Sequence, residues 1–316
     1  MSRPITSLVL TLLIASTSVS AGHKVILQGQ SPDGGRLVIL DEKGGVAWHK
    51  KWGGIHDIHV LDNGNIMVQQ MPNKVVELEA KSGKVIWTYD SSKQNGNKGK
   101  KVEVHAFQPL KDGNVMIAES GPARIIEVSR DGKLLKEIKL TVNKPHPHMD
   151  TRLARKIASG NYLVCHEGDG AVREYSPEGF VVWEFKVPMF GKKAKGGHGP
   201  DSFGNKCFSA VRMKNGNTLI ATGNGHSVLE VDHNKQVVWK VTQDELSGIK
   251  LAWVTTLEVL PNGNYIIGNC HAGPGQPILI ELEPKTKRVV WKLDRFKDFG
   301  NNVSNSQILG VKGTLR

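Results

Sequence analysis

Short apolar stretches separated by polar turns run along the whole chain, and one type of turn recurs. It has the form x-Gly-Asn, and its glycines stand at positions 64, 113, 160, 216 and 263, so that successive turns are 47 to 56 residues apart. Turns of the Asn-Gly kind make tight hairpins between antiparallel strands. A repeat of this length is typical of an array of small sheets. The pattern therefore predicts an all-β protein.

Each repeat contains four predicted strands. In the first complete repeat, the turn leads to strands at 66–68 and 75–78, and a further turn leads to a strand at 85–87 that ends in tryptophan. The other repeats follow this plan, although the second has Lys136 where the others have tryptophan. β-branched residues favour strands, and a bulky aromatic can fill the wedge between neighbouring sheets. Four strands per repeat describe the blade of a β-propeller.

The two ends of the chain complete the ring. Residues 25–52 hold only the last three strands of a repeat, and residues 304–310 supply the missing first strand. One blade built from both ends closes the ring and leaves no free edge between blades. The sequence thus predicts a six-bladed β-propeller of four-stranded antiparallel blades, with the shared blade as the sixth.

The first 21 residues predict a secretory signal peptide. A basic start at Arg3 is followed by an apolar stretch at 8–15 and by small residues up to Ala21. The apolar stretch is too short for a membrane anchor, and no other segment predicts a transmembrane span. We therefore expect residues 22–316 to form one propeller domain that is secreted or periplasmic, since no linker divides them.

The charge of the chain is strongly positive, with a formal net charge of +12. Lysines gather in the connections that enter the second and fourth blades: Lys93, Lys98, Lys100, Lys101, Lys192, Lys193, Lys195 and Lys206. These connections open on one face of a propeller, which should attract anions. The alternative is that the basic loops are simply solvated. Nucleic acid is not expected as a partner, because no aromatic residues are interleaved with the lysines.

The three cysteines, Cys165, Cys207 and Cys270, do not form a disulfide framework or a zinc motif. Either they are buried strand residues or one pair is oxidised.

Candidate chemistry lies where the innermost strands begin. Eight positions before the turn of each blade stand His56, His105, Arg152, Phe208, Thr255 and Asn305. Loops on the same face add His148, His166, Glu167, Asp169, His226 and His271. Imidazoles and a guanidinium around a narrow opening suit acid–base catalysis, anion binding or metal binding. The spacing of carboxylates is not diagnostic, so no metal site is predicted. The alternative is that these side chains only bridge waters in a polar channel.

The repeats resemble two propeller families. Strands such as Gly83-Lys84-Val85-Ile86-Trp87 resemble the repeat of pyrroloquinoline quinone (PQQ) dehydrogenases, and residues 55–65 resemble bacterial arylsulfotransferases, which are six-bladed and exported. The second resemblance implies that channel histidines and an arginine hold a sulfuryl group. The chain lacks the vicinal cysteines of the quinone enzymes, their eight blades and the extra domain of the sulfotransferases. No cofactor is predicted, bound quinone is not expected, and fold similarity alone transfers no chemistry.

Two functions stay open at this point. In the first, the basic mouth of the channel binds an anionic small molecule or glycan, with group transfer or hydrolysis as the associated chemistry. His56 and His105 are then the acid–base or nucleophilic candidates, and Arg152 holds the anion through its planar fork. The predicted ligand-binding residues are His148, His166, His271, Thr255 and Asn305. In the second, the propeller is a non-catalytic scaffold for an envelope protein partner.

Overall fold

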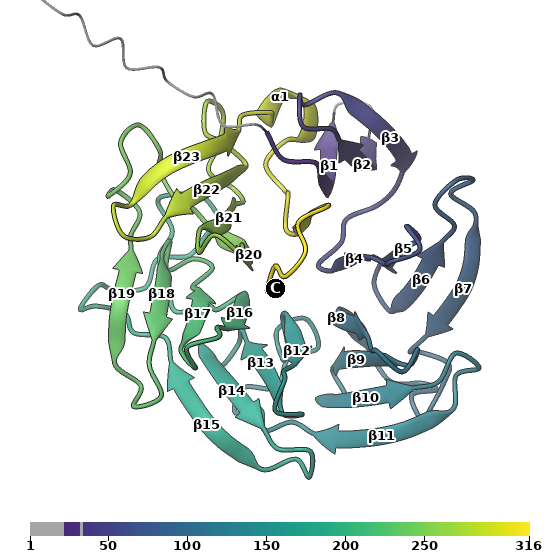
Figure 1. Cartoon of the computed structure of the whole chain (residues 1–316). Helices are drawn as coiled ribbons and strands as arrows, with labels where there is room; N and C mark the ends of the chain where they lie inside the picture. Colours follow the sequence, from purple (N-terminus) through teal and green to yellow (C-terminus); the bar gives the residue numbers. More distant parts are fainter. Residues whose placement is uncertain (1–21, 32–33) are drawn as a thin grey trace, which may run out of the picture.

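The computed structural model describes residues 22–31 and 34–316. Within them, 24 strands form six four-stranded antiparallel sheets arranged around a common axis (Figure 1). The prediction of an all-β, six-bladed propeller is confirmed. The predicted signal peptide lies outside the described residues.

The first five blades each follow the chain from the innermost strand to the outermost. The first and second blades are β4 (Ile58–Val60), β5 (Ile66–Gln70), β6 (Lys74–Leu78) and β7 (Val85–Asp90), then β8 (Glu103–Pro109), β9 (Val115–Ser120), β10 (Arg124–Val128) and β11 (Leu134–Lys139). The third and fourth are β12 (Ala154–Lys156), β13 (Tyr162–His166), β14 (Ala171–Tyr175) and β15 (Val181–Lys186), then β16 (Ser209–Arg212), β17 (Thr218–Ala221), β18 (Val228–Val231) and β19 (Val237–Val241). The fifth is β20 (Val254–Val259), β21 (Tyr265–Asn269), β22 (Leu279–Glu283) and β23 (Arg288–Leu293).

The sixth blade joins the two ends of the described chain. Its innermost strand, β24 (Ser306–Ile308), pairs with β1 (Val25–Ser31), which is followed by β2 (Gly34–Leu40) and β3 (Val46–Lys51). Val25 stands opposite Ile308 in the antiparallel register. The predicted closure by both ends is therefore confirmed.

The recurring asparagine of the turn has a structural role. In the first blade, Gly64 adopts a positive φ of 83°, which a side chain would disfavour. Asn65 then donates from Nδ2 to the carboxylate of Glu77 on the third strand, at 2.7 Å. Equivalent bonds join Asn161 to Glu174, Asn217 to Glu230 and Asn264 to Glu281. In these four blades the asparagine thus fixes the first hairpin to the third strand, whereas Asn114 of the second blade donates to Asp112 within its own turn.

The tryptophans of the outer strands join neighbouring blades. Trp87 donates from Nε1 to the carbonyl of Arg130, in the outer hairpin of the next blade, at 2.7 Å. Trp183 and Trp239 make the same kind of bond to the carbonyls of His233 and Pro284. Most of the buried apolar side chains lie between adjacent sheets, on strands such as β9 and β21, which are buried along their whole length.

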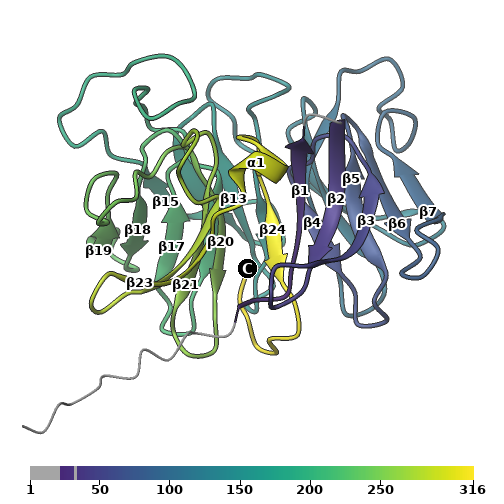
Figure 2. The ribbon, with the colours of Figure 1, turned by 90° about the horizontal axis from the view of Figure 1, so that it is seen from above.

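The two faces of the ring differ. The longer connections, with the short helix α1 (Phe296–Phe299), lie on one face, as Figure 2 shows. The x-Gly-Asn turns lie at the other ends of the inner strands, and the chain reaches the centre of the ring at residue 316 (Figure 1). Among the described residues, no helix has the length and apolar character needed to cross a bilayer.

Candidate functional site

A cavity of about 250 Å³ opens at the channel mouth, on the face that carries the long connections. We call it the mouth cavity. Six of the residues that line it are those that the sequence analysis assigned to the channel or its mouth: His56, His148, Arg152, Phe208, Thr255 and His271. The structure thus brings three of the predicted imidazoles and the guanidinium of Arg152 to one cavity.

Three histidines form a contiguous group there. His56 precedes β4, His105 lies in β8, and His148 belongs to the connection between β11 and β12. The ring of His56 is 4.6 Å from that of His105 and 6.0 Å from that of His148, and the last two rings are 5.1 Å apart. His56 and His105 come together because they hold equivalent positions near the starts of neighbouring inner strands, and the connection that enters the third blade brings His148 beside them.

Arg152 lies beside this group but is already engaged. Its Nε donates to the carboxylate of Glu167, and Nη1 lies 3.2 Å from Nδ1 of His105. Lys206 contacts the other oxygen of Glu167 at 2.9 Å. Burial would raise the pKa of Glu167, but Arg152 and Lys206 together lower it. One buried carboxylate therefore offsets part of the positive charge, and the mouth is less basic than the sequence suggests.

Glu103 is a member of the site that the sequence reasoning missed. Its Oε2 lies 2.6 Å from Nδ1 of His148 and 3.1 Å from Nε2 of His105. Contact with His105, and to a lesser extent with His148, lowers the pKa of Glu103 to about 2. Since side chains two residues apart on a strand share a face, the position of Glu103 relative to His105 was the available signal.

The buried imidazoles are held in the neutral form at pH 7. Burial, then the proximity of His105 and Arg152, lowers the pKa of His56 well below its ordinary value. Burial and Arg152 likewise lower the pKa of His105 to about 4. A neutral imidazole can accept a proton or bind a metal ion, whereas an imidazolium can do neither.

The remaining predicted residues are divided between the mouth cavity and the walls of the channel. His271 lines the cavity, with its ring 5.3 Å from that of His198. Thr255 is fully buried, and its hydroxyl has no hydrogen-bond partner among the described residues. His166 is buried against the carbonyl of Asp150 and the hydroxyl of Tyr175, at 2.7 and 2.9 Å, and does not line the cavity.

Asn305 acts within the channel rather than at its mouth. It donates from Nδ2 to the carbonyl of His56 and to the carboxylate of Asp57.

The three cysteines are buried free thiols, so the alternative of an oxidised pair is wrong for this structure.

Comparison with known proteins decides the family. Residues 33–293 match the PQQ-like family model (PQQ_2) described as "Outer membrane protein assembly factor BamB". The chain belongs to this family. The predicted resemblance to the PQQ repeat is thereby confirmed, whereas the resemblance to arylsulfotransferases stays a prediction. Among curated protein sequences, none matches the chain.

Solved structures similar to this PQQ-like propeller share its fold. A protein of unknown function from Bacteroides caccae is 23% identical with a TM-score of 0.72, over 90% of this chain and 98% of that one. A streptogramin B lyase is 11% identical with a TM-score of 0.55, over 87% and 84% of the two chains. A catalytically inactive virginiamycin B lyase from Staphylococcus aureus, with quinupristin, is 11% identical with a TM-score of 0.55, over 88% and 87%.

In this family member, the buried carboxylate of Asp57 joins the inner strands that line the channel. Asp57 accepts from both terminal nitrogens of Arg155, at 2.7 and 2.9 Å, and from the backbone N–H of Phe107 on β8. Burial would raise the pKa of Asp57, but Arg155 and His59 hold it well below its ordinary value. Asp57 thus ties the inner strands of several blades together.

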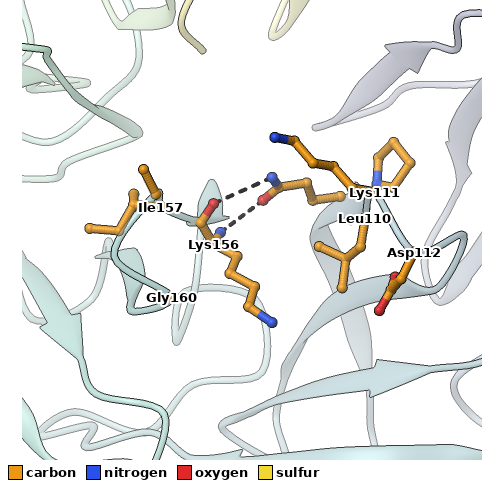
Figure 3. Close-up of a pocket in the computed structure, with 9 residues that line it drawn as sticks. Leu110, Lys111, Asp112, Lys156, Ile157 and Gly160 are labelled. Carbon is orange, nitrogen blue, oxygen red and sulfur yellow. Dashed lines mark hydrogen bonds between the residues drawn. The ribbon is translucent and has the colours of Figure 1, made fainter.

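A larger hollow of about 530 Å³ lies at the opposite face, between the first hairpins of the second and third blades (Figure 3). Gln108 bridges the two hairpins, because its side chain donates to the carbonyl of Lys156 and accepts from the N–H of the same residue. The figure shows Lys111, Asp112 and Lys156 at its rim, with no histidine or cysteine among the residues that line it. Its chemistry is therefore less varied than that of the mouth cavity.

Proposed function

We propose that this PQQ-like propeller binds an anionic small molecule or glycan in the mouth cavity. One observation carries the proposal: Nδ1 of His56 is buried and has no partner among the described residues, at the wall of a cavity also lined by Arg152. A buried polar atom without a partner costs free energy, and a bound ligand or water that meets it removes that cost.

The size of the cavity limits the ligand. At about 250 Å³ it lies below the 300–1,000 Å³ of typical drug-sized sites. It therefore suits a single anionic group, such as a sulfate, phosphate or carboxylate ester, or one acidic sugar unit. The side chain of His148 is 45% exposed, and Lys206 reaches over the ring of Trp253 at 5.5 Å. An imidazole, an ammonium group and aromatic surface are therefore available to such a group.

Electrostatics supports the choice of an anion. Lys192, Lys193 and Lys195 are exposed on the connection between β15 and β16, which also carries His198 of the cavity wall. Clustered positive charge raises the local concentration of anions and the rate of their association. The exposed lysines thus draw the ligand in, while His56 and Arg152 hold it.

Binding is tested with anionic probes and two variants. Sulfate, phosphate, phenyl sulfate and glucuronate are added to the protein in a thermal-shift assay, with chelator present to remove metal ions. We expect at least one probe to raise the melting temperature of the wild type, and to do so less in His56→Ala and in Arg152→Lys, which keeps the charge but loses the fork. His233→Ala, on an exposed outer hairpin, is the matched control.

The outcome that contradicts the proposal is a wild type that no probe stabilises, or equal stabilisation of all the variants. Arg152→Lys is preferred to alanine because removal of the guanidinium would leave Glu167 buried with Lys206 as its only cationic partner. Turnover of phenyl sulfate, measured in the same samples, tests whether group transfer or hydrolysis accompanies binding.

A second candidate function is a protein-interaction scaffold of the cell envelope. It is supported by the description of the family and by apolar side chains exposed on or beside the outer strands, where Phe180 is 71% exposed and Ile86, Val182 and Val238 are also exposed. Such residues at the rim are suited to protein contacts. A partner cross-linked in the periplasm, retained by His56→Ala and lost in Phe180→Ser, would favour this function over the first.

We also propose a periplasmic location. The predicted signal peptide and the description of the family support it. Cell fractionation followed by sequencing of the mature N-terminus should find the protein outside the cytoplasm, beginning near Gly22. A cytoplasmic protein that retains Met1 would contradict this.

A further inference from the structure

A second feature of the mouth is a set of three ligand atoms of the kind that metal ions prefer. The atoms belong to Glu103, His105 and His148, and all lie within 4.8 Å of one another. Two imidazole nitrogens and one carboxylate oxygen form the protein ligand set of many catalytic zinc sites, which keep a fourth position open. Of the residues described, these three form the one cluster with such a spacing.

The orientation of His105 is that of a metal ligand. Its Nδ1 lies 2.9 Å from the carbonyl of Thr151, which can only accept, so this contact is a hydrogen bond when Nδ1 carries the proton of the ring. In that tautomer the lone pair is on Nε2, which lies 3.1 Å from Oε2 of Glu103 and 3.3 Å from Nη1 of Arg152. Two acceptors that face each other need a proton or a cation between them. A backbone carbonyl that fixes the tautomer is the usual outer partner of a metal-binding histidine.

The loop that carries His148 is fixed in place. Asp150 accepts from the N–H of His146 at 2.6 Å and from the N–H of Gly121, in the turn between β9 and β10, at 2.9 Å. The first bond joins the two ends of the short segment to each other, and the second holds the segment to the second blade. His148 is nevertheless 45% exposed, so an ion can reach the cluster from the mouth.

The charges around the cluster are compatible with a cation. Glu103 supplies one negative charge, while Arg152, the nearest fixed positive charge, is paired with Glu167. Glu167 in turn contacts Lys206 as well. The cluster itself contains one carboxylate and two imidazoles, and divalent metal binding requires imidazole ligands in their neutral form.

The distances need little adjustment. A tetrahedron with metal–ligand bonds of 2.0–2.1 Å has edges of about 3.3 Å. The contacts from Oε2 of Glu103 are 2.6 and 3.1 Å, and no pair exceeds 4.8 Å, so small rotations of side chains would equalise them. The ring of His56 is 4.6 Å from that of His105, and its unpartnered Nδ1 offers a fourth ligand or a contact to a metal-bound water.

We propose that Glu103, His105 and His148 bind a divalent first-row transition-metal ion, with Zn²⁺ preferred, and leave one coordination position directed toward the mouth cavity. This site is independent of the proposed anion binding, because the ion alone is the ligand that is measured. A water or an anionic group would complete the coordination sphere at the open position.

The experiment uses the mature protein without a histidine tag, because a tag would itself bind the metal. The protein is treated with chelator, dialysed, and titrated with Zn²⁺ by calorimetry and with Co²⁺ by visible absorption. We expect one ion per chain, with a Co²⁺ spectrum of low coordination number. Glu103→Gln and His148→Ala should weaken Zn²⁺ binding by at least about 100-fold, which is the upper end of what loss of an outer-shell partner causes.

Two controls make the result decisive. His271→Ala removes another imidazole from the same cavity and should bind Zn²⁺ as the wild type does. Circular dichroism of each metal-free variant confirms that it folds, and His148→Ala serves if Glu103→Gln does not. The proposal is overturned if the wild type binds no ion at unit stoichiometry, if both cluster variants bind as tightly as the wild type, or if His271→Ala is weakened equally. Because the anion assay contains chelator, failure of one proposal leaves the other unaffected.

Discussion

Glu258 is a buried acid whose ionisation should make the stability of the propeller depend on pH. It lies on β20 and is fully buried, and its two carboxylate oxygens accept from the N–H of Ile308 on β24 at 3.0 and 3.2 Å. Burial raises the pKa of Glu258 to about 7, although Arg316 and the N–H of Ile308 act in the opposite direction. The folded protein thus holds a proton there that the unfolded chain releases at its ordinary pKa of 4.5.

The sign and size of the effect follow from this difference. Between pH 4.5 and about 7 the folded state binds more protons at Glu258 than the unfolded state, so stability falls as pH rises through this window. Each unit of difference corresponds to about 1.4 kcal/mol, which gives a loss of about 3 kcal/mol in all. The contribution is fully present below pH 4.5 and is lost above pH 7.

The assay compares urea unfolding of the wild type with that of Glu258→Gln from pH 4 to pH 8. The difference between the two proteins is needed because buried histidines act oppositely: burial lowers the pKa of His105 and of His166 to about 4, so their contribution to stability falls as pH drops from 6.5 toward 4. The variant should gain about 3 kcal/mol relative to the wild type across the range. A difference that stays constant within about 0.5 kcal/mol would refute the reasoning.

Three further predictions concern the stability of the ring. Asp57→Ala leaves Arg155 buried without its partner and should lower the free energy of unfolding by about 3–5 kcal/mol in urea titrations; a loss below 1 kcal/mol would contradict the central role of Asp57. Trp87→Phe keeps most of the ring but loses the bond to the carbonyl of Arg130 and weakens the stacking of that guanidinium, 4.3 Å away; calorimetry should show a loss of about 1–2 kcal/mol rather than none. Asn217→Ala removes the bond from the turn to the third strand, and the midpoint in urea should shift by the equivalent of about 1 kcal/mol without a change in slope, whereas an unchanged midpoint would show that the turn holds without it.

The fold could be predicted because the residues that define a blade lie close together in the sequence, within one repeat or the next. The x-Gly-Asn turn sets a hairpin, its asparagine binds the third strand, and the tryptophan of the fourth strand reaches the next blade, as Asn65 and Trp87 show. These are contacts within a repeat or between consecutive repeats, and they need no knowledge of distant residues. The closure through β24 followed from the strand that the first unit lacked.

The composition of the mouth could be predicted only in part. A constant offset from the turn placed His56, His105 and Arg152 near one another, because equivalent positions in each blade lie at the same height. The offset could not show which charges are paired: Glu167 is 15 residues from Arg152, and Glu103 is 45 residues from His148. Such pairs depend on how loops of different blades meet, which the repeat does not encode.

Two carboxylates that contact imidazoles illustrate how a structural group can be told from a functional one. Asp57 is saturated, since its two oxygens accept from the guanidinium of Arg155, from backbone N–H groups and from an amide. Glu103 receives its two contacts, from His105 and His148, on the same oxygen, and His148 lines the mouth cavity. A saturated buried carboxylate stabilises the fold, whereas one with spare acceptor capacity beside neutral imidazoles can take up a ligand. Replacement of Asp57 should therefore reduce the stability of the protein far more than its affinity for Zn²⁺, and replacement of Glu103 should do the reverse.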